Sequence, residues 1–265
     1  LPRGAWEPAM VPALLLVLTG CAAKVEVNKP AHVVATPLRL RLGDKVVRGI
    51  LYDKPPDRKP RPALVLIHAD RGLTDWEKEQ ARRLAGKGYV VLAVDLYRGA
   101  TTPDVMDAHI MGRALPDDRV MADLKSAVDL LAGLRWVRHA AIGVIGWDIG
   151  GGYALDAALR DRRLRAVVVC YGRLTTDPAL LAPLQAPVLG IFAGKDEGIS
   201  AKTIDQFRAA MRKAGKRVAG TDVYPTCGHG FMDPASPENS APPDTAAVAD
   251  AWDKIDTFLA AELKP

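Results

Sequence analysis

The sequence has few cysteines, few aromatic residues and no block of charge of a single sign. Its 265 residues include three cysteines, at positions 21, 170 and 227, which are too few for a disulfide framework. No C-x-x-C or H-E-x-x-H spacing occurs, so we expect no metal site. Aromatic residues amount to 6%, and Lys and Arg exceed Asp and Glu only by 36 to 31, without a run of five basic residues. This composition argues against a nucleic-acid-binding protein.

The N-terminal residues differ from the rest and resemble an export segment. Residues 11–18 form an apolar stretch of about eight residues, far below the roughly 20 that span a bilayer as a helix. That length fits the hydrophobic part of a signal peptide. The next residues, L-T-G-C, end at Cys21 and resemble a bacterial lipobox, in which the cysteine is lipidated. We therefore predict a lipoprotein signal over 1–20 and a tether over 21–36. The protein would be exported and lipid-anchored to a bacterial membrane, facing the periplasm or the cell exterior.

The remainder of the chain alternates between short apolar runs and segments of helical periodicity. At 49% hydrophobic and 25% charged, it can bury one large core. Apolar alternation on both sides of a Gly-Asp pair predicts an N-terminal antiparallel hairpin. The later strand–helix alternation indicates a mostly parallel twisted sheet with helices on both faces. We predict one monomeric α/β domain over 37–265. Its strands are expected at 37–42, 46–52, 63–67, 90–94, 142–145, 164–171, 188–192 and 218–224, and its helices at 75–87, 117–134, 150–160, 201–214 and 246–262.

One junction between a predicted strand and a predicted helix carries the strongest signal for a catalytic site. Residues 142–152 read I-G-V-I-G-W-D-I-G-G-G, with Asp148 between Gly146 and Gly150. This is the layout of a nucleophile elbow, in which small residues two positions away let the strand and the helix pass closely. The start of the helix would direct the N–H of Ile149 toward a developing oxyanion. Alone, however, this pattern also fits an ordinary strand–helix turn.

Two further residues follow the elbow in the order that this type of site requires, which is nucleophile, acid, histidine. Asp196 stands in a loop directly after a predicted strand, and His229 stands between two glycines after the last predicted strand. By themselves they fit a capping aspartate and a surface histidine. Their order and their positions after strands favour a catalytic triad of Asp148, His229 and Asp196.

Five motifs together resemble the dienelactone hydrolase family of α/β hydrolases. They are H-x-x-x-G-L-x-D-W, D-L-Y-R-G, G-W-x-x-G-G-G-Y, F-x-G-K-D-x-G-I and Y-P-x-x-G-H-G-F-M, and the resemblance runs from about 45 to 262. It implies an α/β-hydrolase fold and a small-molecule substrate. It also implies cleavage of cyclic or activated esters by a Cys–His–Asp triad, without a metal or organic cofactor.

Two positions depart from the family's pattern. The elbow residue, a cysteine in the family, is Asp148, and the glutamate that follows the loop histidine in the family is Ala69. The resemblance implies that these positions face each other, where two carboxylates would repel. An alanine at position 69 therefore removes the repulsion that a carboxylate at position 148 would otherwise meet. Neither remaining cysteine stands on the elbow: we interpret Cys170 as a small buried residue and Cys227 as a residue near the pocket rim.

An aspartate on the elbow leaves several chemistries open. Attack on an ester carbonyl would give an anhydride, whereas attack at a saturated carbon gives a stable enzyme ester that His229, oriented by Asp196, hydrolyses with water. Haloalkane dehalogenases and epoxide hydrolases use this second route. Asp148 could instead act as general base on a water that attacks a lactone, or the protein could bind a ligand without turnover. We predict a hydrolase of small esters or lactones, and we expect Trp147 to pack under the elbow.

The resemblance also suggests the residues that contact the substrate. Arg98 matches the family's arginine that pairs with a substrate carboxylate, so the substrate is expected to be anionic, although Arg98 also fits a surface charge at a strand end. Arg71 would add positive potential near the pocket mouth, and Tyr171 and Arg173 would line the same face. The N–H groups of Ile149 and Asp70 would form the oxyanion hole. All these residues lie at or after the carboxyl ends of predicted strands, where open α/β sheets bind their ligands.

Overall fold

The computed structural model describes residues 32–42, 45–54, 59–237 and 244–264. They fall within one unit, Ala31–Pro265. The predicted signal peptide, Cys21 and the Gly-Asp pair at 43–44 lie outside the described residues. The first strand begins at Val34, so three residues that we expected to end the tether are part of the sheet.

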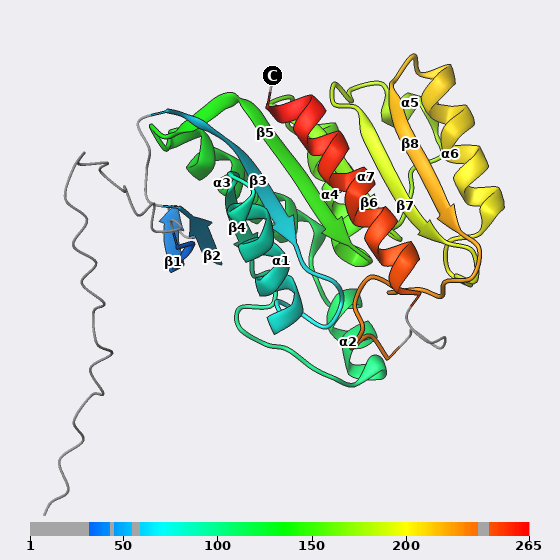
Figure 1. Ribbon diagram of the computed structural model, residues 1–265, viewed down its shortest axis with the longest axis horizontal. Helices are drawn as coiled ribbons and strands as arrows, with labels where there is room; N and C mark the ends of the chain where they lie inside the picture. The colour runs from blue at the N-terminus through cyan, green and yellow to red at the C-terminus, as the bar shows by residue number, and fades with distance from the viewer. Residues whose placement is uncertain (1–31, 43–44, 55–58, 238–243, 265) are drawn as a thin grey trace, which may run out of the picture. The chain divides into compact units, whose positions relative to one another are not determined.

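The described residues form one sheet of eight strands (Figure 1). Their bounds are β1 Val34–Leu42, β2 Lys45–Asp53, β3 Arg61–Ile67, β4 Val90–Val94, β5 Val137–Trp147, β6 Leu164–Cys170, β7 Val188–Ala193 and β8 Val218–Tyr224. The strand order is β1-β2-β4-β3-β5-β6-β7-β8. β1 and β2 pair as an antiparallel hairpin and β2 runs antiparallel to β4, whereas all pairings from β4 to β8 are parallel. The predicted hairpin and mostly parallel sheet are thus confirmed.

Strand β3 shows why the central strands consist of unbroken apolar runs. Val65 and Ile67 contribute to the core on one face of the sheet, and Leu64 and Leu66 contribute to the core on the other. All four side chains are fully buried. Because both faces of a parallel sheet are covered, every position of such a strand favours an apolar residue.

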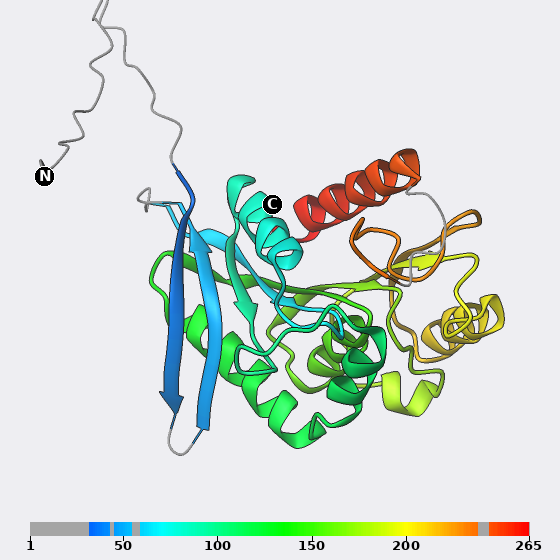
Figure 2. The same cartoon turned by 90° about the horizontal axis from the view of Figure 1, so that it is seen from below.

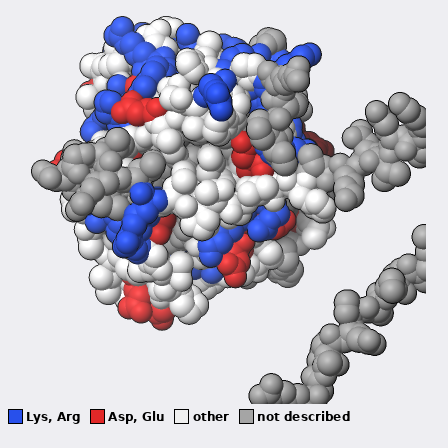
Figure 3. All heavy atoms as spheres, turned by 90° about the vertical axis from the view of Figure 1, so that its left-hand side faces the viewer, with Lys and Arg blue, Asp and Glu red and all other residues white. Residues whose placement is uncertain are grey.

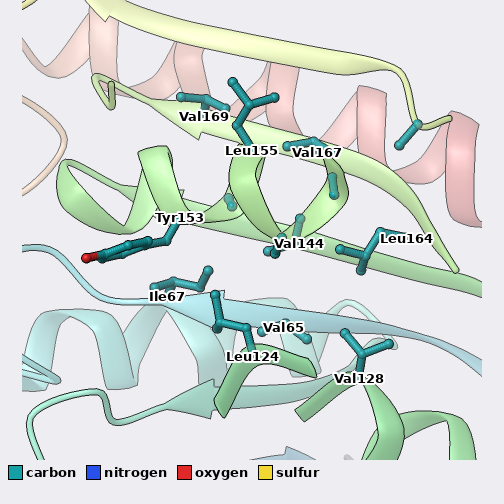
Figure 4. Packing of buried hydrophobic residues seen from close by; sticks show 14 of the residues in the cluster. Val65, Ile67, Leu124, Val128, Val144, Tyr153, Leu155, Leu164, Val167 and Val169 are labelled. Carbon is teal, nitrogen blue, oxygen red and sulfur yellow. The ribbon is translucent and has the colours of Figure 1, made fainter. Parts of the chain in front are cut away.

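Helices cover both faces of this sheet. Their bounds are α1 Asp75–Gly86, α2 Val105–Arg113, α3 Asp117–Gly133, α4 Ile149–Arg160, α5 Pro178–Leu181, α6 Ala201–Lys213 and α7 Thr245–Leu263. Helices α1 and α7 pack on one face, and α3, α4 and α6 pack on the other (Figures 1 and 2). Figure 4 shows the second layer from close by, with Leu124 and Val128 of α3 and Leu155 of α4 against the central strands. These two layers agree with the predicted α/β-hydrolase fold.

Three elements differ from the prediction for local reasons. Helix α2 was not predicted, because Ala108 is its only buried residue and it therefore has no apolar stripe. Helix α5 has only four residues, too few for a periodicity to be visible. Strand β5 begins at Val137 rather than at 142, since Arg138 and His139 do not continue the apolar run.

The surface carries charge of both signs. Figure 3 shows the face at the left of Figure 1, where Lys and Arg stand in several separate groups, some of them beside Asp or Glu. Among the helices of the described residues, none is both long and apolar enough to cross a membrane.

Candidate active site

Asp148 lies at the junction of β5 and α4, in a strained backbone conformation. Its φ is 50° and its ψ is −119°, a region that residues with a side chain rarely adopt. A Cβ atom at Gly146 would lie 2.1 Å from the carbonyl oxygen of Gly150, and one at Gly150 would lie 2.4 Å from that of His68. Only glycine fits at these two positions, so the turn has the close packing of a nucleophile elbow.

The loops after β7 and β8 bring Asp196 and His229 to this elbow. Nδ1 of His229 lies 2.8 Å from Oδ2 of Asp196, and Nε2 lies 3.4 Å from Oδ1 of Asp148. The other oxygen of Asp196 accepts hydrogen bonds from the N–H groups of Gly198 (2.8 Å) and Ile199 (3.0 Å). The histidine ring therefore stands between two carboxylates, one of which is fixed by the backbone.

The second oxygen of Asp148 accepts one of the two N–H groups that were predicted to form the oxyanion hole. The N–H of Asp70, in the loop after β3, donates to Oδ2 of Asp148 at 3.1 Å. Ile149 is the first residue of α4 and lines the adjoining cavity. The two expected hole residues thus flank the elbow, but one of their N–H groups is bound to the protein's own carboxylate.

The two carboxylates change the protonation of His229. Burial alone would lower its pKa, but the hydrogen bonds and charges of Asp148 and Asp196 outweigh burial and raise the pKa to about 10. Burial would likewise raise the pKa of Asp196, but the bonds from His229 and from two backbone N–H groups lower it below its usual value. The two neighbouring acidic side chains thus favour the protonated form of the His229 ring.

A cavity of about 840 Å³ opens over these residues. It lies at the carboxyl ends of the parallel strands, as expected for an open α/β sheet. Its lining includes the triad residues, Ile149 and the predicted Tyr171, whose ring meets that of His229 edge-on at 5.1 Å. Sequence reasoning did not single out the further polar side chains of the lining, namely His109, Asp117, Tyr153, Lys195 and Glu197.

Some of these missed residues could have been found from their sequence distance to residues that were predicted. Tyr153 follows Ile149 by four residues on α4 and therefore shares its face. Lys195 and Glu197 are the immediate neighbours of Asp196. His109 had no such signal, because it lies on the unpredicted helix α2.

The two predicted substrate-binding arginines are each paired with an aspartate. Arg98 forms an ion pair with the buried Asp123 at 2.6 Å. Arg71 pairs with Asp233 and donates to the carbonyl oxygen of Ala235 at 3.0 Å, so it fastens the loop that carries His229. Neither arginine lines the large cavity. Arg98 is therefore not placed to bind a substrate carboxylate at the triad, whereas Arg71 lies at a small cavity beside Asp148 and His229, held by Asp233.

Trp147 and the two described cysteines lie in the core and not in the cavity. Trp147 is fully buried and packs edge-on against Trp76, at a ring distance of 5.1 Å, under the elbow. Cys170 and Cys227 are buried, and burial raises the pKa of both thiols, which disfavours a thiolate nucleophile. In the part of the chain that is described, no group of three His, Cys, Asp or Glu side chains is placed to hold a metal ion.

Comparisons with known proteins match both the sequence and the fold. The family model of the dienelactone hydrolase family matches residues 47–263. A Methylorubrum extorquens protein that carries the name carboxymethylenebutenolidase is 30% identical over 259 residues, which cover 92% of this chain and 87% of the relative. A protein of the same name from Escherichia coli K12 is 29% identical and covers 74% of this chain and 75% of its own.

Solved structures show the same fold at lower sequence identity. A dienelactone hydrolase-like promiscuous phosphotriesterase from metagenomic libraries has a TM-score of 0.76 at 23% identity and covers 87% of this chain and 99% of its own. The dienelactone hydrolase of Anabaena variabilis has a TM-score of 0.63 at 18% identity and covers 88% of this chain and 100% of its own.

Proposed function

The chain belongs to the dienelactone hydrolase family, and on that premise we propose that it hydrolyses small lactones or esters with Asp148 as its nucleophile. The family makes the protein a hydrolase, and the names of its relatives support a lactone as substrate. The cavity of about 840 Å³ has room for a small molecule. Whether that molecule is anionic stays a prediction, since Arg98 and Arg71 each pair with an aspartate instead.

The orientation of the Asp148 carboxylate is the observation that carries this proposal. Oδ2 accepts the N–H of Asp70, and Oδ1 faces Nε2 of His229. An N–H that already holds Oδ2 is not free for the carbonyl oxygen of a substrate, which disfavours attack of a water on the lactone carbonyl. The same N–H is correctly placed for an oxyanion that forms on Asp148 itself. This favours the route in which Asp148 becomes esterified.

In the first step, Oδ1 of Asp148 attacks the saturated carbon beside the ring oxygen of the lactone, so the proposed substrate differs from the butenolide in the relatives' names, whose ring oxygen is bonded to unsaturated carbons only. A bond forms between Oδ1 and that carbon, the bond from carbon to the ring oxygen breaks, and its electron pair leaves on the substrate's new carboxylate. A carboxylate, with a pKa near 4, needs no proton to leave at neutral pH. The product of this step is an alkyl ester of Asp148.

In the second step, a water attacks Cγ of the esterified Asp148 and passes a proton to Nε2 of His229. The oxyanion forms on Oδ2, where the N–H of Asp70 holds it. Collapse breaks the bond between Cγ and Oδ1, and the alcohol leaves with the proton from His229. The oxygen of the water remains in the Asp148 carboxylate, and Oδ1 leaves in the alcohol.

The charge of Asp148 controls when His229 can act as a base. While Asp148 is ionised, the pKa of His229 stands at about 10 and the ring keeps its proton. Esterification removes that negative charge, so the pKa of His229 falls and the ring releases its proton to solvent before water is activated. Asp196 stays hydrogen-bonded to Nδ1 and orients the ring throughout.

Two other chemistries in the same site have less support. Hydrolysis of a carbon–halogen bond or of an epoxide would use the same esterification, but the indole of Trp147 is packed in the core and does not line the cavity as a halide donor. General-base catalysis would require Asp148, paired with a protonated His229, to take a proton from water.

Single-turnover hydrolysis of (R)-β-butyrolactone in ¹⁸O-water tests the route. Attack at the saturated carbon inverts that centre, so we expect (S)-3-hydroxybutyrate and ¹⁸O in the Asp148 peptide. In His229→Gln, the adduct on Asp148 should accumulate, and Asp148→Asn should form none. The (R)-product with ¹⁸O in its own carboxylate, and no adduct in His229→Gln, would overturn the nucleophile and favour a general base. No turnover of lactones or esters, together with turnover of 2-chloropropionate or an epoxide, would favour the second chemistry.

A further inference from the structure

A second, much smaller cavity adjoins the triad. Its volume is about 20 Å³, and one water molecule requires roughly 10–15 Å³ of such space. Three side chains line both this cavity and the large one, namely Asp148, Tyr171 and His229. The two cavities therefore meet at the carboxylate and the imidazole that carry the proposed chemistry.

Several polar side chains reach the wall of this small cavity, among apolar ones such as Ala69 and Trp76. Glu77 of α1, a residue that is 1% exposed, lines this cavity, and its carboxylate accepts the N–H of Thr74 at 3.0 Å. Asp233, Arg71 and Ser236 contribute further polar groups from the neighbouring loops. A water held in a protein needs two to four polar partners, and this lining offers them. An apolar cavity of the same size would not hold a water.

Ala69 supplies the small wall residue that leaves this space. It follows His68 in the loop after β3, and its N–H lies 3.4 Å from Oε1 of Glu77. Its side chain ends at the methyl group, so any larger residue at this position takes space from the cavity. The substitution of Ala69 for the family's glutamate is thus linked to the cavity as well as to the charge of Asp148.

The proposed function creates a need for such a compartment. Once Asp148 is esterified, the alkyl group occupies the large cavity beside Oδ1, so the hydrolytic water must reach Cγ along a path that the substrate does not fill. We propose that the small cavity at Ala69 holds the water that hydrolyses the Asp148 ester. The bound water attacks Cγ, its proton passes to Nε2 of His229, and the bond from Cγ to Oδ1 breaks. This inference rests on the proposed function and adds the position of its second substrate.

The test separates the two steps in a series of variants at position 69. Ala69→Val and Ala69→Leu should slow hydrolysis of the Asp148 ester, by at least tenfold for leucine, and in the order of side-chain size. The rate at which (R)-β-butyrolactone esterifies Asp148 should change by less than about threefold, because the large cavity is untouched. Rapid-quench mass spectrometry of the Asp148 peptide measures both rates. The matched control is Ala140→Leu, an exposed position at the start of β5, which should leave both rates unchanged.

The outcomes distinguish the water site from the nucleophile. An ester that forms and hydrolyses at the wild-type rate in folded Ala69→Val and Ala69→Leu would overturn the water site and leave the nucleophile intact. Absence of any ester, in the wild type and in His229→Gln alike, would overturn the proposed function and the water site together. Equal slowing of both steps would also contradict the water site, since it would indicate a general distortion of the elbow. Circular dichroism and urea unfolding establish that each variant is folded.

Discussion

At the residue scale, the environment of Asp148 explains how a carboxylate is accommodated at the elbow. One oxygen accepts the N–H of Asp70 and the other faces the ring of His229. Ala69 itself adds no carboxylate beside Asp148, although those of Glu77 and Asp233 line the small cavity with it. The negative charge of Asp148 helps to raise the pKa of His229. The protonation of the ring therefore depends on the charge at position 148.

Stability should depend on pH through His229. Its pKa is raised from 6.5 to about 10 on folding, so the folded state binds a proton that the unfolded state releases between these values. The stabilisation is complete below about pH 6.5 and is lost as the pH rises toward 10. Measured by urea unfolding, the free energy of unfolding of the wild type should decrease by about 1–3 kcal/mol over this pH range, whereas that of His229→Gln should not. The same decrease in both proteins would contradict the ion-paired histidine.

Placing at positions 148 and 69 the two residues that the family resemblance implies there should introduce thiol chemistry. Asp148→Cys together with Ala69→Glu places a thiol on the elbow and a carboxylate in its neighbourhood, while His229 and Asp196 stay in place. We expect thiol-dependent cleavage of p-nitrophenyl acetate to rise by roughly 10²–10⁴-fold over Asp148→Cys alone, the range of a general acid–base partnership. Iodoacetamide should abolish the gain. A folded double variant without gain would indicate that His229 and Asp196 are not aligned for this reaction.

At the element scale, the junction of β5 and α4 depends on two glycines. Gly150→Ala would place a methyl group 2.4 Å from the carbonyl oxygen of His68, on a backbone that is packed from both sides. We expect a loss of more than about 3 kcal/mol in urea unfolding, or no soluble protein. The matched control is Gly133→Ala at the end of α3, where nothing lies within 4 Å of the new atom, and its stability should be unchanged or slightly higher. Equal stability of the two variants would contradict the strained elbow.

At the scale of the whole molecule, location stays a prediction, because residues 1–31 lie outside the described part. We propose that the protein is a lipoprotein anchored through Cys21. Expressed in a bacterial host, the full chain should partition with membranes and incorporate labelled palmitate, whereas Cys21→Ala should do neither. Cys227→Ala is the matched control and should behave as the wild type. Equal partitioning of wild type and Cys21→Ala would contradict the lipid anchor. The predicted monomer is checked by light scattering of the domain.

The sequence alone determined the architecture and the order of the candidate catalytic residues. An unbroken apolar run such as that of β3 indicates a strand that is buried on both faces. Glycines such as Gly146 and Gly150 indicate that two backbone segments pack closely there. Both signals depend only on a residue and its near neighbours in the sequence. Helix α2 was not predicted, because a helix that buries only Ala108 has no periodic apolar pattern in its sequence.

Only the tertiary structure decided what the charged side chains contact. Arg98 and Arg71 stand in loops that follow strands at the site's edge of the sheet. Their side chains nevertheless form ion pairs with residues from other segments, Arg98 with Asp123 and Arg71 with Asp233. The occupation of the Asp70 N–H by Asp148 and the cavity at Ala69 likewise depend on segments that meet only in the folded chain. An ion pair or a cavity is set by distances of a few ångströms between remote loops, and a sequence pattern carries the local geometry but not those distances.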